Sequence, residues 1–336
     1  MAAPSRAHLV LGLKVVVLAV SCVLVYRTIM SLGPAQVWAQ AQGAHQGWLV
    51  AAVAAILARY LFWHMKWRNM LARHGPVEAG LVWHMIMANS FVNLVTPSAK
   101  IAGGFLRAMV LKLRYDWSFP SAYGQVIADQ LTHLLAKMIL LGSLLLWSTY
   151  ALPQLMPRAT AAILGCCLLL IALPWLAWRA VLRRQLEKLS PHSAWRRRLS
   201  AYSRKVTENG EDAVEELFKP LLQGGSNRQV WSNDLLLSAL SFGVFCYSNG
   251  LVLHSLGVEV SWPTVALVVL LGYLAGTMMG IMGGIGVTEL FLMKLYASCG
   301  IPEEAAAAAA LLHRGLFYAY LLLVGSFSFL VVGKKV

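Results

Sequence analysis

Two short stretches of the chain combine helix-breaking residues with a charged side chain at their end in mostly apolar sequence. The first, NLVTPSAKIAGGFLR at 93–107, places a proline and two glycines before Arg107, and the second, GIMGGIGVTE at 280–289, places four glycines before Glu289. Glycine weakens a helix and a buried carboxylate is costly, so the combination indicates backbone that faces a ligand or another segment. A helix that begins at such a break presents unpaired N–H groups and a partial positive charge, which favours an anionic group such as phosphate.

The two charged residues suggest complementary roles at these breaks. Arg107 offers a planar, permanently charged fork that suits phosphate oxygens, although a side chain snorkelling to the membrane interface is the alternative. Glu289 could hold Arg107, bind a cationic headgroup or take up a proton. For the glycines, close packing of small residues between helices is the alternative, and GTMMG at 276–280 fits it as well.

Further ionisable residues lie inside apolar runs. Asp129, His133 and Lys137 are spaced i, i+4 and i+8 and share one helix face, and Arg314 follows His313 in the last apolar run. Ionisable residues within a membrane usually line a cavity and are paired, so these side chains are candidate ligands. A purely structural salt bridge is the alternative.

The elements that position these residues follow from composition. The chain has 336 residues, of which 59% are hydrophobic and 12% are charged, and its mean hydropathy is +0.65. Soluble domains carry about 25% charged residues, so this composition indicates an integral membrane protein. Because the apolar runs are continuous rather than alternating, they predict an all-α, polytopic helical bundle. The runs cover 9–26, 48–65, 79–96, 121–150, 159–182, 231–256, 263–282 and 302–333.

Charge in the connecting segments predicts the orientation of the helices. The region 179–228 holds eleven Lys or Arg residues and is cytoplasmic by the positive-inside rule, as is the C-terminus with its final lysines. If 79–96 crossed the membrane fully, this basic region would fall outside. We therefore expect 79–114 to form a re-entrant hairpin from the cytoplasm and 263–299 a re-entrant hairpin from outside. About six spanning helices would wall both hairpins, with both termini cytoplasmic.

Two local assignments accompany this topology. Lys66, Arg68 and Arg73 are placed in a cytoplasmic loop that follows a helix over 48–65. At the N-terminus we expect a retained first helix, and a signal peptide ending near the AQA of 39–41 is the alternative.

We expect a single integral membrane domain over 1–336. Within it, 1–47 would form a first helix and an outer segment, and 48–182 a first repeat with the inner hairpin and an extra helix. A basic cytoplasmic loop, 183–230, would separate these from a second repeat, 231–336, which contains the outer hairpin. Each repeat places a hairpin between two spanning helices, and the two run in opposite directions. Inverted repeats that meet at mid-bilayer are typical of transporters.

At these same residues the chain resembles the flippase-like membrane domain of lysylphosphatidylglycerol synthetases and the stand-alone bacterial and archaeal proteins that share it. The likeness extends from about residue 50 to the end. Three departures are Phe105, Gln130 and Met282, where the family usually has a glutamate, an arginine and a proline. The motifs that carry the likeness are NLVTPSAKIAGGFLRAMVL, SAYGQVIADQLTHLL and GGIGVTELFLMKLYASCGIPEEAAAAAALLHRG.

The resemblance implies a protein that moves, or helps to move, a lipid across the bilayer. Because nothing after Val336 corresponds to the synthetase's soluble aminoacyl-transfer domain, we expect no lipid aminoacylation. Carried over residue by residue, and with His133 added from its helix face, the resemblance gives a set of candidate substrate-binding residues. They are Asn93, Pro97, Gly104, Arg107, Asp129, His133, Gly283, Gly284, Gly286, Glu289 and Arg314.

The predicted function is translocation of a phosphate-bearing lipid headgroup, of a phospholipid or a polyprenyl-phosphate-linked lipid, across the cytoplasmic membrane. One alternative is a non-catalytic scaffold or accessory subunit for lipid or cell-envelope biosynthesis. Another is a membrane enzyme acting on lipid-linked substrates, with Asp129 or Glu289 as general base. No catalytic residue, metal or cofactor is expected.

Membrane lipids with anionic or zwitterionic headgroups are the expected partners. A homodimer and cell-envelope biosynthesis partners stay open as further alternatives. Most of the positive charge behind the net +14 lies between the apolar runs, where topology and anionic lipid account for it, so no nucleic acid is expected as a partner.

Overall fold

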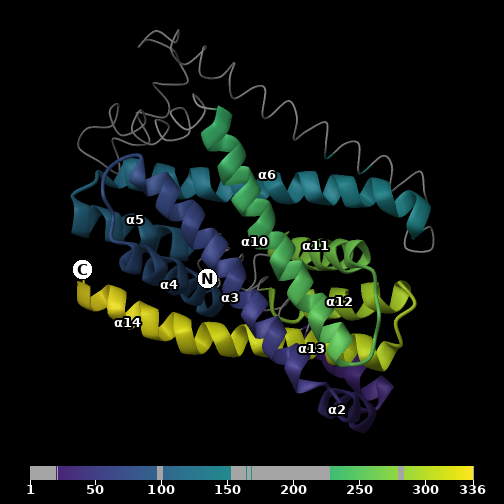
Figure 1. The fold of residues 1–336 in the computed structure, drawn as a ribbon. Coiled ribbons are helices and arrows are strands. Elements are labelled where there is room, and N and C mark those ends of the chain that lie inside the picture. Colours follow the sequence, from purple (N-terminus) through teal and green to yellow (C-terminus); the bar gives the residue numbers. More distant parts are fainter. Residues whose placement is uncertain are drawn as a thin grey trace, which may run out of the picture.

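The fold is a bundle of helices (Figure 1). The computed structural model describes residues 22–96, 101–152, 228–278 and 284–335, with the single positions 20, 164 and 168, and contains no strand among them. Four of the helices in these ranges are long and apolar enough to cross a membrane: Gln46–Ala72, Phe119–Ala151, Gln229–Ser255 and Glu303–Lys335. The all-α polytopic class is therefore confirmed. Two further expected spans, most of 9–26 and 159–182, lie outside the described residues.

The helices alternate between long and short ones along the chain. Four of them, α4, α5, α11 and α12, have 17, 15, 17 and 12 residues, fewer than the about 20 that a spanning helix needs. The bounds are α2 (Pro34–Gln42), α3 (Gln46–Ala72), α4 (Ala79–Val95), α5 (Ile101–Tyr115), α6 (Phe119–Ala151), α10 (Arg228–Ser255), α11 (Trp262–Met278), α12 (Val287–Ser298), α13 (Glu303–Tyr320), the π-helical turn η2 (Leu321–Gly325) and α14 (Ser326–Lys335).

The long helices α3 and α10 pack side by side and run in opposite directions. The backbone N–H of His45, just before α3, donates to the carbonyl of Ser255 at the end of α10, with an N···O distance of 2.8 Å. At the other end, Arg73 Nη2 lies 2.9 Å from Asp234 Oδ1. This antiparallel pair forms the centre of the bundle, between the two short-helix hairpins (Figure 1).

The α4–α5 hairpin begins and ends at the same end of the bundle. The Tyr115 hydroxyl accepts a hydrogen bond from the backbone N–H of Glu78 at 3.0 Å, which joins the start of α4 to the end of α5. Lys335 Nζ lies 2.6 Å from Glu78 Oε1, so the end of α14 is at this end too. The hydrogen bond from Lys335 lowers the pKa of Glu78.

The α11–α12 hairpin opens at the opposite end of the bundle. It follows the end of α10 and leads into the start of α13, on the far side of the α3–α10 pair from α4 and α5 (Figure 1). In addition, α4 contacts α14 and α11 contacts α6. Each short-helix hairpin therefore has a helix from the other half of the chain beside it.

Two expectations about the helix boundaries are wrong. The helix predicted over 48–65 continues to Ala72, so Lys66 and Arg68 lie in α3 and not in a loop. In the first hairpin, Gly103 and Gly104 lie inside the first turn of α5 and do not break it. Any break between α4 and α5 falls in 96–100, of which residues 97–100 are outside the described part of the chain.

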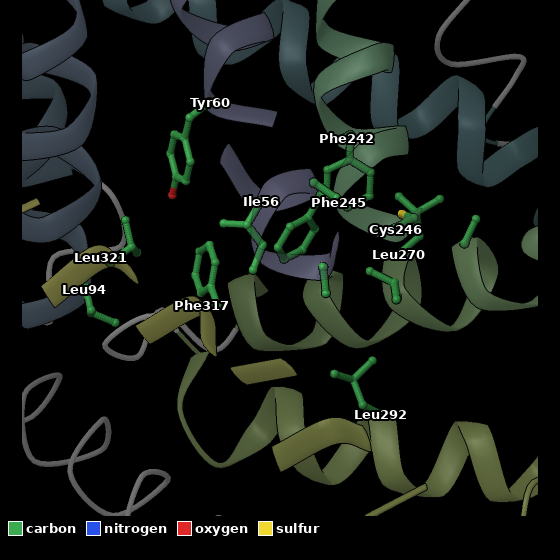
Figure 2. Close-up of a cluster of buried hydrophobic side chains, with 14 of the residues drawn as sticks. Ile56, Tyr60, Leu94, Phe242, Phe245, Cys246, Leu270, Leu292, Phe317 and Leu321 are labelled. Atoms are coloured by element: carbon green, nitrogen blue, oxygen red, sulfur yellow. The ribbon is translucent and has the colours of Figure 1, made fainter. Parts of the chain in front are cut away.

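An apolar cluster occupies the middle of the bundle. Figure 2 shows Ile56 of α3, Phe245 of α10 and Phe317 of α13 pointing toward one another. The rings of Phe245 and Phe317 meet edge to face with centroids 5.5 Å apart. Tyr60 stacks on Tyr320 with ring centroids 5.7 Å apart, so α3 also contacts the end of α13.

Candidate functional site

Close contact at Gly103 holds the α4–α5 hairpin together. The backbone N–H of Gly103 donates to Asn93 Oδ1 at 3.0 Å, so the side chain of Asn93 caps the start of the returning helix. A Cβ at Gly103 would lie 2.5 Å from the Asn89 carbonyl oxygen, and one at Gly104 would lie 3.0 Å from Val126 of α6. Both glycines thus let α5 approach its neighbours closely.

The tip of the second hairpin is shaped by glycines in a different way. Gly284 and Gly286 have φ of +73° and +81°, in the left-handed region that favours glycine, and Gly286 is the N-cap of α12. A Cβ at Gly284 would also lie 3.2 Å from the Cα of Gly276 in α11. The predicted helix break and the alternative of small-residue packing therefore both hold here.

Asp129 of α6 is the centre of a buried charged cluster. Its Oδ1 lies 3.0 Å from Lys66 Nζ, and its Oδ2 lies 2.8 Å from Arg107 Nη1. Trp63 Nε1 donates to the same carboxylate at 3.1 Å from Oδ2, and His133 Nε2 lies 3.7 Å from Oδ1. We call these five residues the Asp129 cluster; they come from α3, α5 and α6.

The Asp129 cluster carries more positive than negative charge. Lys66 and Asp129 are 0% exposed and Arg107 is 1% exposed, so both cations share one carboxylate away from water. The guanidinium of Arg107 also lies over the Trp67 ring, 4.5 Å from its centroid. Even when His133 is neutral, the described members of the cluster sum to one positive charge.

A second buried cluster joins α11, α12 and α13. Arg314 Nε lies 2.7 Å from Glu289 Oε1, and Arg314 Nη1 donates to the hydroxyl of Tyr273 at 3.2 Å. The Tyr318 hydroxyl contacts both Arg314 and Glu289. We call these four residues the Glu289 cluster. It pairs one cation with one anion among its described members, unlike the Asp129 cluster.

The two clusters are built in a similar way, but the hairpin residue is a cation in one and an anion in the other. In each, a residue on the second hairpin helix pairs with one on the spanning helix that follows: Arg107 with Asp129, and Glu289 with Arg314. The suggestion that Glu289 holds Arg107 is therefore not what the structure shows. Each charged pair joins the second helix of a hairpin to the helix that follows it.

Arg59 lies between the clusters, close to the apolar centre. Its guanidinium carbon is 4.1 Å from the ring centroid of Phe245 and 5.4 Å from that of Phe317. Its Nη1 is buried and has no hydrogen-bond partner among the described residues. It is near enough to interact electrostatically with His133 of one cluster and Tyr273 of the other.

The candidate residues thus divide into distinct groups. Arg107, Asp129 and His133 come together in one cluster, and Glu289 and Arg314 in the other. Those that shape the hairpins instead are Asn93, Gly104, Gly284 and Gly286. Pro97 and Gly283 lie outside the described residues.

Sequence reasoning missed Trp63, Lys66 and Arg59, which all belong to α3. A usable signal was present for Lys66, because Trp63, Trp67 and Met70 continue the helical spacing past the predicted end of the helix.

Two of the residues that depart from the family pattern pack against neighbouring side chains or backbone. The Phe105 ring lies 5.2 Å from that of Phe119, and a Cβ at Gly104 would lie 3.3 Å from Gln130 Nε2.

Comparison with known proteins places the chain in a family of membrane proteins. The family model described as the lysylphosphatidylglycerol synthase TM region matches residues 13–325. The chain belongs to this family. The predicted resemblance is thereby confirmed, and the matched residues include both hairpins and both clusters. A curated relative, the UPF0104 membrane protein PH1989 of Pyrococcus horikoshii, is 21% identical over 277 residues, which cover 79% of this chain and 81% of the relative.

Proposed function

We propose that the protein moves a phosphate-bearing lipid headgroup across the cell membrane. The observation that carries this proposal is the positive excess of the Asp129 cluster, in which Lys66 and Arg107 share one carboxylate out of contact with water. Charge within a membrane is costly and usually serves function. An excess of cations at such a site favours an anionic ligand, and a phosphate group supplies the missing charge.

The two hairpins suggest a route for the headgroup. They open at opposite ends of the bundle and carry their charged pairs on the helices that return from the tips. In the proposed path, the headgroup passes between the hairpins while its acyl or prenyl tails stay in the bilayer. The family's name supports a lipid as the substrate class, since it includes lysylphosphatidylglycerol synthases. The path involves no covalent change, so we propose transport without catalysis.

Vesicles provide the test. The full chain is reconstituted with fluorescent phosphatidylglycerol, and movement between leaflets is followed by quenching of the outer leaflet. We expect movement in wild-type vesicles and a reduction of roughly tenfold or more in Arg107→Gln, because a phosphate contact is lost. Arg114→Gln removes an exposed arginine from the same helix and should leave the rate unchanged. Equal rates in folded wild type and Arg107→Gln would contradict the proposal, and absent movement in wild type would favour a scaffold.

A further inference from the structure

The Asp129 cluster holds more hydrogen-bond donors than acceptors. The Asp129 carboxylate already accepts from Trp63 and contacts Lys66 and Arg107. Nevertheless, in the part of the chain that the structure describes, the buried Nε of Arg107 has no hydrogen-bond partner. The indole N–H of Trp67, beneath that guanidinium, also lacks a partner among the described residues. Buried donors without acceptors are costly and uncommon in folded proteins.

A phosphate group would correct both imbalances at once. It brings negative charge, and its oxygens are hydrogen-bond acceptors that suit the fork of Arg107 and the ammonium of Lys66. The donors already converge on one place, because a single carboxylate is within 3.3 Å of Trp63, Lys66 and Arg107.

We propose that Trp63, Lys66 and Arg107 form the phosphate-binding site, and that Asp129 occupies this site when no phosphate is bound. The inference deepens the proposed function and rests on it for the identity of the ligand as a lipid headgroup. Asp129 acts as an internal competitor: its carboxylate neutralises part of the positive charge in the empty site and leaves the cations when phosphate enters.

Competition by Asp129 has two consequences for transport. It weakens phosphate binding, so that the headgroup can leave the site again, as any conducting site requires. It also couples binding to the hairpin, because the Arg107–Asp129 contact joins α5 to α6. When phosphate displaces the carboxylate, this contact is released and α5 is free to move relative to α6.

Binding to the purified full chain in detergent tests the site, with dioctanoyl phosphatidic acid as the probe. Asp129→Asn removes the competitor, so we expect the probe to bind at least about tenfold more tightly than to wild type. The control is Asp234→Asn, which removes a buried carboxylate that pairs with Arg73 and reaches Lys66 only electrostatically, so any gain should be smaller. Unchanged affinity in Asp129→Asn, or an equal gain in Asp234→Asn, would overturn the proposal.

A second variant keeps the test decisive if Asp129→Asn does not fold. Lys66→Gln leaves Arg107 and Asp129 as a neutral pair, and it should weaken probe binding at least about tenfold. Its control is Arg68→Gln, which removes an exposed cation from the same helix and should bind the probe as wild type does. If Lys66→Gln binds the probe as tightly as wild type does, the proposed phosphate site is wrong.

Two further ligands distinguish the source of the phosphate. Dioctanoylglycerol, which lacks phosphate, should not bind, and binding as tight as that of phosphatidic acid would overturn the proposal. Inorganic phosphate should compete weakly, which supports a site for phosphate carried on a lipid. If inorganic phosphate binds as tightly as phosphatidic acid and responds to the same variants, the site stands and the lipid function fails. Conversely, the wild-type protein could move lipid while Asp129→Asn leaves probe binding unchanged. That result would support the proposed function and overturn the proposed site.

Discussion

Lys66 contacts Asp129 at two atoms of the same residue. Its Nζ lies 3.0 Å from Oδ1 and also donates to the backbone carbonyl at 2.9 Å, while the hydroxyl of Thr132 donates to that carbonyl as well. The ammonium thus holds both the side chain and the main chain of α6 against α3. This contact links α3 and α6 at the position where Arg107 of α5 also contacts Asp129.

The stability of the Asp129 cluster should depend on its charge balance. Asp129→Leu leaves two buried cations without a counter-charge, so we expect it to lower the free energy of unfolding by roughly 3–5 kcal/mol. Lys66→Met alone should cost much less, because Arg107 and Asp129 remain as a neutral pair. Adding Lys66→Met to Asp129→Leu should recover part of the loss. Unfolding in detergent, followed by tryptophan fluorescence, measures all three, and strictly additive effects would contradict this account.

The Glu289–Arg314 pair should be coupled energetically. Glu289→Gln leaves the guanidinium of Arg314 buried beside Tyr273 without its carboxylate, and we expect a loss of stability of about 1–3 kcal/mol. The double variant with Arg314→Gln should lose less than the sum of the single losses. A double-mutant cycle of unfolding free energies should give a coupling of roughly 0.5–3 kcal/mol. A coupling near zero would mean that the pair contributes nothing to folding.

Close approach at Gly103 should make this position intolerant of a side chain. A Cβ there would fall 2.5 Å from the carbonyl of Asn89, so Gly103→Ala must push α4 and α5 apart. We expect a loss of about 1–3 kcal/mol in unfolding experiments. Gly315→Ala is the matched control, because a Cβ at this position of α13 meets nothing within 4 Å and alanine favours the helix. If both variants are equally stable, the contact does not constrain the hairpin.

The sidedness of the hairpins can be tested with single cysteines in a cysteine-free background. Gly75→Cys and Asp116→Cys flank the α4–α5 hairpin, and Glu259→Cys and Gly300→Cys flank the α11–α12 hairpin. A membrane-impermeant maleimide should label the first pair from one side of the membrane and the second pair from the other. A hairpin that crosses the membrane completely would have its two flanking cysteines labelled from opposite sides.

Hydropathy predicts much of this fold because a helix in lipid satisfies its own backbone hydrogen bonds. The runs at 121–150 and 231–256 anticipate α6 and α10 to within a few residues. The predicted end of α3 is wrong because a lysine is usually exposed to water, and Lys66 therefore suggested a loop. Its charge is compensated by Asp129, 63 residues further along the chain, and no local pattern encodes that pairing.

The sequence indicates which charged residues belong to the candidate site better than it indicates which of them form ion pairs. Arg107, Asp129 and Glu289 stand out as charges in apolar sequence. Which cation meets which anion depends on how the helices pack, and two opposite charges at equivalent hairpin positions suggested a contact that does not form. Gly103 likewise suggested a broken helix, because a glycine needed for close packing has the same sequence pattern as one needed for a turn.

The contacts of α4 with α14 and of α11 with α6 have a consequence for biogenesis. Each hairpin contacts a helix from the other half of the polypeptide. The first hairpin therefore lacks part of its packing until the C-terminal helix α14 has been synthesised. Fragments divided between α6 and α10 should therefore be degraded when produced singly, and should rescue each other when produced together.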